Sequence, residues 1–358
     1  MTDVWDKLKA AVKPIVLYGM GDGAVKILNI FQRLGIKTAG IFASDEFVRG
    51  HSFLGYKIYT YSDICKKYDD FIIITAFATS LPRVMDRIYT LAQKHELYAP
   101  DVPVAGGDLF NMEFYLSNLK KIDAARDLLE DKKSIEIYND IIDYRLSGDV
   151  SLLQKTSCEK IESWEILNPQ NFTSYADIGA YNGDTIREIL TVSDNIDHIV
   201  ALEPDSRNFK KLVNYINENA CRFSGINVEL HNTAAWNENT VLPFDIRGGR
   251  NSKPADKSNA YVTVKAEKLD SILHGSTLRG RKIDYIKYDV EGAEAEALQG
   301  SESTIKKYSP SLTVSIYHRP GDIFNLIEYV HDLNPKYKLY IRRFPYIPAW
   351  DLNLYAVI

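Results

Sequence analysis

The chain has 358 residues, of which 45% are hydrophobic and 25% charged, and its formal net charge is −5. This composition is typical of a soluble globular protein, and the length favours two domains that can each bury a core of ordinary size. The mild acidity argues against nucleic acid as the main partner, because contact with many phosphates needs a dense basic surface.

The beginning of the chain and its cysteines indicate a cytoplasmic protein. Residues 1–13 are amphipathic and charged, without the apolar core of a signal peptide, and no run of about eighteen apolar residues predicts a membrane span. Cys65, Cys158 and Cys221 are isolated, which argues against a metal knuckle or a disulfide framework. We therefore expect three reduced thiols.

Residues 1–105 are predicted to form a small Rossmann-like domain. Residues 14–24 indicate a buried strand followed by a turn that contains Gly19, Gly21 and Gly23, and a helix is expected over residues 25–34. These glycines could let a nucleotide diphosphate approach the start of the helix, with Asp45 near a ribose. Alternatively, they only allow the helix to pack tightly against its strand.

Residues 106–165 are predicted to form a helical connector. Apolar residues recur at spacings of three and four over residues 111–118, 122–129 and 134–146. The segment lacks the glycine, proline and serine content of a free linker, so we expect it to be ordered and packed on one or both domains. It could also form a homodimer interface, although solvent-facing helices would give the same pattern.

The most informative stretch is residues 175–185, where a short apolar run ends at Asp177. Gly179 and Gly183 follow at a spacing that allows a strand to turn sharply into a helix while its backbone stays open to a ligand. No Gly-Lys-Ser/Thr follows, so the turn is not a phosphate loop. The pattern instead predicts a nucleotide-cofactor loop at the carboxyl end of a strand.

Three further apolar runs end in polar residues in the same way. Within residues 198–205 the apolar run ends at Glu203 and Pro204, and a carboxylate there can accept both hydrogen bonds of a ribose diol. Residues 228–236 and 283–294 continue the series. Each of the four predicted strands therefore ends where a ligand would bind.

These motifs resemble those of class I S-adenosylmethionine-dependent methyltransferases, and more narrowly those of the FkbM family. The resemblance covers residues 175–358 and implies a doubly wound, seven-stranded α/β sheet over residues 166–358, closed by a hairpin with one antiparallel strand. It implies S-adenosyl-L-methionine as the cofactor. The motifs that carry it are Asp177-Ile178-Gly179-Ala180, Gly183-Asp184-Thr185, Glu203-Pro204 and Asp289-Val290-Glu291-Gly292-Ala293-Glu294.

By this resemblance, thirteen positions are expected to bind the cofactor. Glu203 is expected to hold the ribose, and Asp184 or Thr185 to cap the helix that follows the turn, although both could be purely structural. The expected set is Asp177, Gly179, Tyr181, Asn182, Gly183, Asp184, Thr185, Glu203, Pro204, Asn232, Thr233, Ala234 and Asp289.

Three residues are candidates for the catalytic step. Methyl transfer needs a nucleophile in line with the sulfonium and a group that takes its proton. Asp289 is the first candidate for this role and His318, at the end of the next predicted strand, is the second. Glu291 is the third, although it could instead stabilise its loop. No obligatory metal is expected, since the spacing of Asp289 and Glu291 relative to Asp322 or Asn325 is not diagnostic.

Residues 244–260 are polar and long for a loop. They could form a lid over the acceptor, with Arg247, Arg250 and Lys253 contacting a phosphate or a sugar. An exposed loop without such a role would have the same composition.

The predicted function is O-methylation of a hydroxyl on a small-molecule or carbohydrate-like acceptor, possibly a sugar or nucleotide-sugar, and N-methylation stays open. One alternative is a nucleotide- or nucleotide-sugar-binding protein in which the N-terminal domain is the active module. The other is an NAD-dependent oxidoreductase that uses residues 19–23. Against the oxidoreductase, no Tyr-x-x-x-Lys motif stands in a suitable context.

Overall fold

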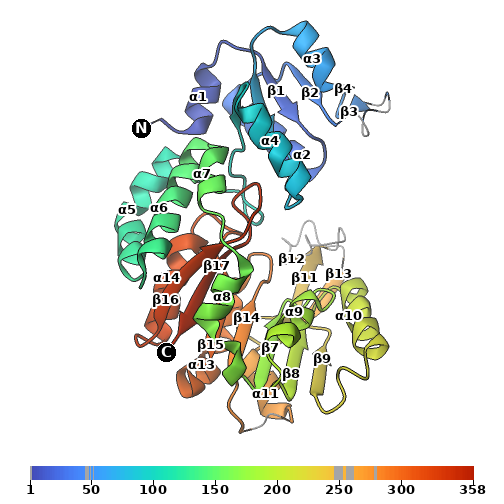
Figure 1. The fold of residues 1–358 in the computed structure, drawn as a ribbon, viewed down its shortest axis with the longest axis vertical. Coiled ribbons are helices and arrows are strands. Elements are labelled where there is room, and N and C mark those ends of the chain that lie inside the picture. Colours follow the sequence, from blue (N-terminus) through green and yellow to red (C-terminus); the bar gives the residue numbers. More distant parts are fainter. Residues whose placement is uncertain are drawn as a thin grey trace.

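The computed structural model describes residues 2–44, 48, 50, 52–245, 253–254, 262–277 and 280–358. Figure 1 shows an N-terminal α/β domain, then a group of helices, and then a second, larger α/β domain. Within these residues, no helix is both long and apolar enough to cross a bilayer. Asp45 and most of residues 244–260 lie outside the described residues.

The N-terminal domain contains a six-stranded sheet with the order β3-β4-β2-β1-β5-β6. Its central strands β1 and β5 are parallel and buried along their whole length, which explains why both are continuously apolar. The strands are β1 (Ile15–Tyr18), β2 (Gly40–Phe42), β3 (Ser52–Phe53), β4 (Tyr56–Tyr59), β5 (Ile72–Thr75) and β6 (Glu96–Tyr98), and the helices are α1 (Val4–Ala10), α2 (Asp22–Leu34), α3 (Tyr61–Lys67) and α4 (Pro82–Ala92).

Four helices follow: α5 (Met112–Asp127), α6 (Lys132–Ser147), α7 (Val150–Lys155) and α8 (Lys160–Leu167). The two expected helical stretches at residues 111–118 and 122–129 are one continuous helix, α5. Lys120 and Lys121 interrupt the apolar periodicity between them, but both are good helix formers. Helix α5 packs against α14 (Asp322–Leu333), and α6 packs against β16 (Lys338–Arg343).

The C-terminal domain contains a seven-stranded sheet with the order β16-β17-β15-β14-β7-β8-β9. All pairs are parallel except those of β17, which runs antiparallel to β15 and β16. This confirms the doubly wound fold expected from the sequence. The strand order reverses between β7 and β14, where such sheets bind ligands. The strands not yet given are β7 (Ser174–Ile178), β8 (His198–Leu202), β9 (Asn227–His231), β14 (Tyr285–Tyr288), β15 (Ser311–Ser315) and β17 (Leu352–Val357).

Residues 294–308 form two short helices, separated at Gly300 and Ser301. The first of these helices ends at Gly300, where a Cβ atom would lie 2.0 Å from the carbonyl oxygen of Trp236. Gly300 is the C-cap of α12, and its lack of a side chain allows this close backbone approach. The helices of the domain are α9 (Asp184–Val192), α10 (Ser206–Glu218), α11 (Leu269–Gly275), α12 (Glu294–Gln299), α13 (Glu302–Tyr308) and α14.

A second, four-stranded sheet lies beside the main one, and the sequence analysis did not predict it. The expected strand at residues 228–236 divides between β9 and β10, which belong to different sheets. The start of the expected loop at residues 244–260 is also strand, because Phe244 pairs with Pro254. The small sheet contains β10 (Ala234–Ala235), β11 (Thr240–Asp245), β12 (Lys253–Pro254) and β13 (Val262–Glu267).

Backbone hydrogen bonds join the N-terminal part of the chain to the loops after β15 and β16. Thr79 and Ile347 exchange two of them, at 2.8 and 2.9 Å. Ala105 donates its N–H to the carbonyl of His318 at 3.0 Å. The first domain therefore holds two loops at the carboxyl edge of the second sheet.

Candidate active site

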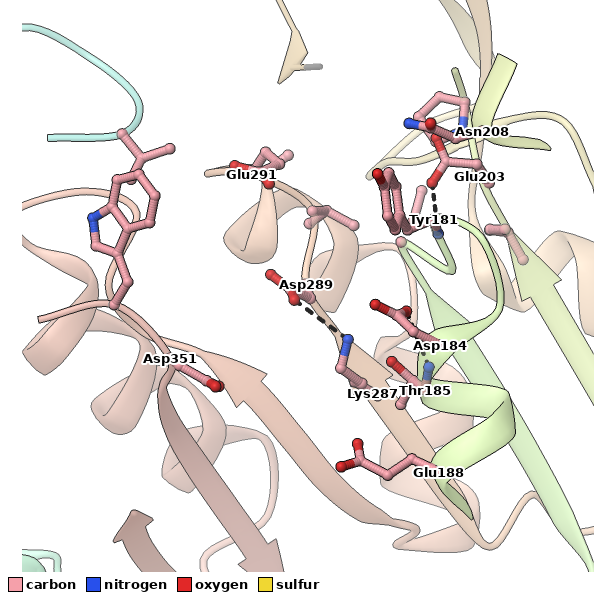
Figure 2. Close-up of a pocket in the computed structure, with 18 of the residues that line it drawn as sticks. Tyr181, Asp184, Thr185, Glu188, Glu203, Asn208, Lys287, Asp289, Glu291 and Asp351 are labelled. Carbon is pink, nitrogen blue, oxygen red and sulfur yellow. Dashed lines mark hydrogen bonds and ion pairs between the residues drawn. The ribbon is translucent and has the colours of Figure 1, made fainter. Parts of the chain in front are cut away.

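A cavity of about 570 Å³ opens at the carboxyl ends of β7, β8 and β14. Its volume is in the range of small-molecule sites. In Figure 2, Glu203 and Tyr181 lie on one side, Asp351 lies on the opposite side, and Asp289 and Glu291 lie between them. The predicted site residues that line it are Gly179, Tyr181, Asp184, Thr185, Glu203, Pro204, Ala234, Asp289 and Glu291.

The turn after β7 is built on two glycines with positive φ. Gly179 has φ +91°, and a Cβ atom there would lie 1.9 Å from the carbonyl oxygen of Asp289. Gly183 is the N-cap of α9 in a left-handed conformation, without a side-chain cap hydrogen bond. The expected cap by Asp184 or Thr185 is therefore wrong. Asp184 instead accepts a hydrogen bond from the backbone N–H of Thr185 at 3.0 Å, inside the first turn.

Glu203 follows β8 and is held in place by backbone donors. Its two carboxylate oxygens accept hydrogen bonds from the N–H groups of Tyr181 and Asp205, each at 2.8 Å. Burial raises the pKa of Glu203 to about 8, against the effect of these two donors. Each oxygen keeps a second lone pair for a ligand hydroxyl.

Lys287, on β14, lines the cavity and was not among the predicted site residues. Its ammonium group lies 3.3 Å from Oδ2 of Asp289. Burial lowers the pKa of Lys287, but Asp289, Asp177 and Asp184 outweigh burial and raise it above its usual value. The sequence signal was a charged residue inside an otherwise apolar strand of a parallel sheet.

His318 lies behind the cavity rather than in its lining. Strand β15 ends at Ser315, three residues before the expected end, and the His318 side chain is fully buried. Its Nδ1 lies 2.9 Å from Oε1 of Glu294, and its Nε2 lies 3.5 Å from Oε2 of Glu291 and 3.6 Å from Oδ1 of Asp289. Burial lowers the pKa of His318, but the three carboxylates raise it to about 10.

An aromatic wall faces the carboxylates across the cavity. It consists of Tyr317, Tyr346 and Trp350, and Asp351 lies next to it. The Trp350 ring lies 5.5 Å from that of Tyr346 and 6.3 Å from that of Tyr317, between centroids. The sequence analysis missed this wall. The available signal was the aromatic and proline-rich run at residues 344–350, between the last two strands.

Unusual backbone conformations gather at this cavity. Among the described non-glycine residues with positive φ, Tyr181 (48°), Glu291 (55°) and Asp351 (57°) line it. Such conformations cost free energy and persist where the surrounding structure holds them, often at functional sites. The strained backbone and the polar lining both mark this cavity as the candidate functional site.

Several predicted residues lie next to the cavity without lining it. Asp177 is fully buried, and burial raises its pKa to about 6. Asn232 donates to the carbonyl oxygens of Glu203 and Pro204 at 2.8 and 3.2 Å, and Thr233 donates to the carbonyl of Lys265 at 2.9 Å. Asn232 and Thr233 thus support backbone around the site. Asn182 and Gly183 are also outside the lining.

In the N-terminal domain, packing accounts for two of the three candidate glycines. A Cβ atom at Gly23 would lie 2.6 Å from the carbonyl oxygen of Ala76, and one at Gly19 would lie 2.3 Å from the ring of Phe77. Only Gly21 faces open space. The fourth candidate, Asp45, lies outside the described residues.

A solved structure shares the fold of nearly the whole chain. The chain is similar to the crystal structure of a methyltransferase FkbM from Methylobacillus flagellatus KT, with a TM-score of 0.73 and 15% identity over 99% of this chain and 92% of that one. Weaker similarity extends to the Aeropyrum pernix fibrillarin in complex with S-adenosyl-L-methionine, with a TM-score of 0.34 and 9% identity over 55% and 74% of the two chains. No curated protein matches the sequence.

The family comparison identifies a methyltransferase, an enzyme that transfers methyl groups. Residues 177–341 match the profile of the family described as the methyltransferase FkbM domain.

Proposed function

We propose that the cavity binds S-adenosyl-L-methionine and that the protein transfers its methyl group to a hydroxyl of a small, carbohydrate-like acceptor. The observation that carries this proposal is one continuous cavity in the FkbM domain that joins Glu203, at the end of β8, to Asp289, after β14. A carboxylate at the first position suits a ribose, and one at the second suits a hydroxyl nucleophile.

The residues present fit this cofactor. Glu203 is pre-oriented by two backbone donors and would hold the ribose hydroxyls. Ala234, Ala235 and Phe244 give an apolar surface for the adenine, while Asp184 and the Lys287 ammonium suit the charged amino-acid portion. When bound, the cofactor supplies an electrophilic methyl group.

Asp289 would orient the acceptor hydroxyl and take its proton, and Glu291 is the second carboxylate in reach of the acceptor. Both line the cavity and are partly exposed, at 32% and 22% of their side-chain areas. His318 is fully buried, so its contribution would pass through these carboxylates.

The aromatic wall supports a sugar ring as the acceptor. Tyr317, Tyr346 and Trp350 offer flat apolar faces with polar edges, which suit the C–H face of a sugar. Asp351 and Glu291 offer acceptors for its hydroxyl groups. The N-terminal domain contributes Val104 to the lining, so it would help to form the acceptor side of the cavity.

The proposal is tested by calorimetric titration with S-adenosylmethionine, S-adenosylhomocysteine and NAD. In Glu203→Ala, S-adenosylhomocysteine should bind about 1–3 kcal/mol more weakly, because the ribose loses its acceptors. Glu203→Gln, which keeps one acceptor oxygen, should lose less. In Gly21→Val, binding should not change. NAD binding that Gly21→Val abolishes would instead assign the activity to the N-terminal domain.

Affinity for the adenosine part should also depend on pH. Since burial raises the pKa of Glu203 to about 8, this carboxyl is mostly protonated at neutral pH and loses its proton as pH rises. An ionised carboxylate accepts both ribose hydroxyls better than the neutral acid does. Methylthioadenosine, which lacks the amino-acid charges, should therefore bind about tenfold more tightly at about pH 9 than at about pH 6.5.

The matched control for this pH dependence is Glu203→Gln, which cannot ionise at this position. Its affinity for methylthioadenosine should stay nearly constant over the same range. Equal pH dependence in wild type and Glu203→Gln would show that another group titrates.

A further inference from the structure

The cavity has more acidic than basic side chains in its lining. Since burial raises the pKa of Glu203 to about 8, that carboxyl is mostly neutral at neutral pH, and the other carboxylates still outnumber the cations. An anionic acceptor would be repelled by this lining, and a cationic one would be attracted. The six acidic residues are Asp184, Glu188, Glu203, Asp289, Glu291 and Asp351, and the three basic ones are Lys160, Arg187 and Lys287.

The basic residues of the lining already have partners. Lys287 pairs with Asp289 at 3.3 Å, and Lys160 pairs with Glu188 at 3.4 Å. Arg187 packs over an aromatic ring of α10, 4.5 Å from the ring centroid. The two lysines therefore neutralise carboxylates other than the one at residue 351.

Asp351 is a half-buried carboxylate that lacks a cation. Its Oδ1 accepts a hydrogen bond from the side-chain amide of Asn353 at 2.9 Å, and among the described residues no basic side chain forms an ion pair with it. The buried Arg343 is close enough for Asp351 to affect its pKa, but its guanidinium donates to Thr156 and to the carbonyl of Tyr346. In Figure 2 the Asp351 carboxylate points into the cavity. A positive group of a ligand would supply the missing partner.

The aromatic wall beside Asp351 suits the same positive group. The ring planes of Tyr317 and Tyr346 differ from that of Trp350 by 27° and 34°, so the three rings have similar orientations. The face of an aromatic ring attracts a cation, and the indole of tryptophan does so most strongly. A carboxylate next to such rings is a common arrangement for binding an ammonium group.

The titration of Tyr317 shows that the electrostatic potential at this wall is negative. Burial raises the pKa of its phenol well above the usual value, and nearby carboxylates raise it further. These carboxylates are Asp289, Glu291, Asp351 and Glu294. A group that disfavours a phenolate in this way favours a cation at the same place.

We propose that the methyl acceptor is an amino sugar, whose ammonium group lies between Asp351 and the aromatic wall. This inference rests on the proposed function and narrows its acceptor class. The ammonium group would donate charge-assisted hydrogen bonds to Asp351 and contact the face of Trp350. A protonated amine has no lone pair with which to attack a methyl group. It therefore serves for recognition, and a hydroxyl of the same sugar remains the nucleophile.

The test measures sugar binding to the full chain by saturation-transfer NMR at about pH 6.5, where the amines are protonated. Three matched pairs are compared, with and without S-adenosylhomocysteine: glucosamine with glucose, galactosamine with galactose, and mannosamine with mannose. In at least one pair the amino sugar should bind about tenfold more tightly than the neutral sugar.

Asp351→Asn should make the two sugars of that pair bind about equally, with little change for the neutral one. The variant is isosteric, and asparagine tolerates the positive φ of 57° at this position, so the fold should be retained. Circular dichroism checks this. The matched control is Glu188→Gln, which removes another negative charge from the same cavity and should keep most of the preference for the amino sugar.

The proposal would be overturned if no amino sugar binds more tightly than its neutral partner, or if none of the sugars binds. Persistence of the preference in Asp351→Asn, or an equal loss in Glu188→Gln, would overturn it as well. Titration with S-adenosylhomocysteine keeps this inference separate from the proposed function. Failure of that titration, with the amino-sugar preference intact, counts against the cofactor site alone. Binding of S-adenosylhomocysteine without any amino-sugar preference counts against the ammonium site alone.

Discussion

Gly179→Ala is expected to lower the free energy of unfolding by about 4 kcal/mol or more, or to prevent folding. The added Cβ atom would lie 1.9 Å from the carbonyl oxygen of Asp289, and that oxygen belongs to backbone rather than to a flexible side chain. The backbone at Gly179 also has φ +91°, which an L-residue adopts only with strain. A clash and strain at one position are among the few causes of such large effects. Urea unfolding monitored by circular dichroism measures the loss.

The matched control is Gly21→Ala in the N-terminal domain. Gly21 has a similar positive φ, +111°, but no atom lies within 4 Å of its added Cβ. It should cost only the strain of its conformation, φ +111° and ψ −158°, about 1–3 kcal/mol. The difference between the two variants isolates the clash between β7 and β14. Equal losses would mean that the loop after β14 can move away from Gly179, and that the site is less rigid than the packing implies.

Arg343→Met is expected to lower the free energy of unfolding by roughly 2–4 kcal/mol. The guanidinium is fully buried at the end of β16 and donates to the carbonyl of Tyr346, to Oγ1 of Thr156 and to the carbonyl of Leu153. Burial lowers its pKa to about 10, so the charge itself is costly. Methionine removes that cost but leaves several buried acceptors unsatisfied, at about 1–3 kcal/mol each.

Arg126→Met is the control for loss of an arginine. Arg126 pairs with Asp123 and Asp127 at the surface, where an ion pair contributes about 1 kcal/mol or less. Arg343 also ties the loop of Tyr346 to α7, so its loss should loosen the aromatic wall. Acrylamide quenching of tryptophan fluorescence measures this, and it should increase in Arg343→Met and not in Arg126→Met. Unchanged stability and quenching in Arg343→Met would contradict the anchoring role.

The polar edge of the second sheet, at the carboxyl ends of its parallel strands, was largely predictable from the sequence. Asp177, Glu203 and Asp289 each follow an apolar run, and parallel strands bring their carboxyl ends to one edge. Gly179 was identifiable because a tight turn from strand to helix needs positive φ. These inferences depend only on local pattern and on the direction of the strands. These inferences stay valid even when the predicted ends of strands and helices are wrong by a few residues.

The sequence by itself therefore determined the α/β class and the sheet edge where polar residues end the strands, because both follow from local patterns along the chain. Only the tertiary structure decided the opposite side of the cavity. Trp350 and Asp351 come from the hairpin after the last helix, and Val104 comes from the N-terminal part of the chain. Their meeting depends on packing between segments far apart in sequence. The pairing of His318 with Glu294 has the same cause, since the chain leaves β15 before His318 and turns its ring toward the start of α12. No local pattern fixes that path.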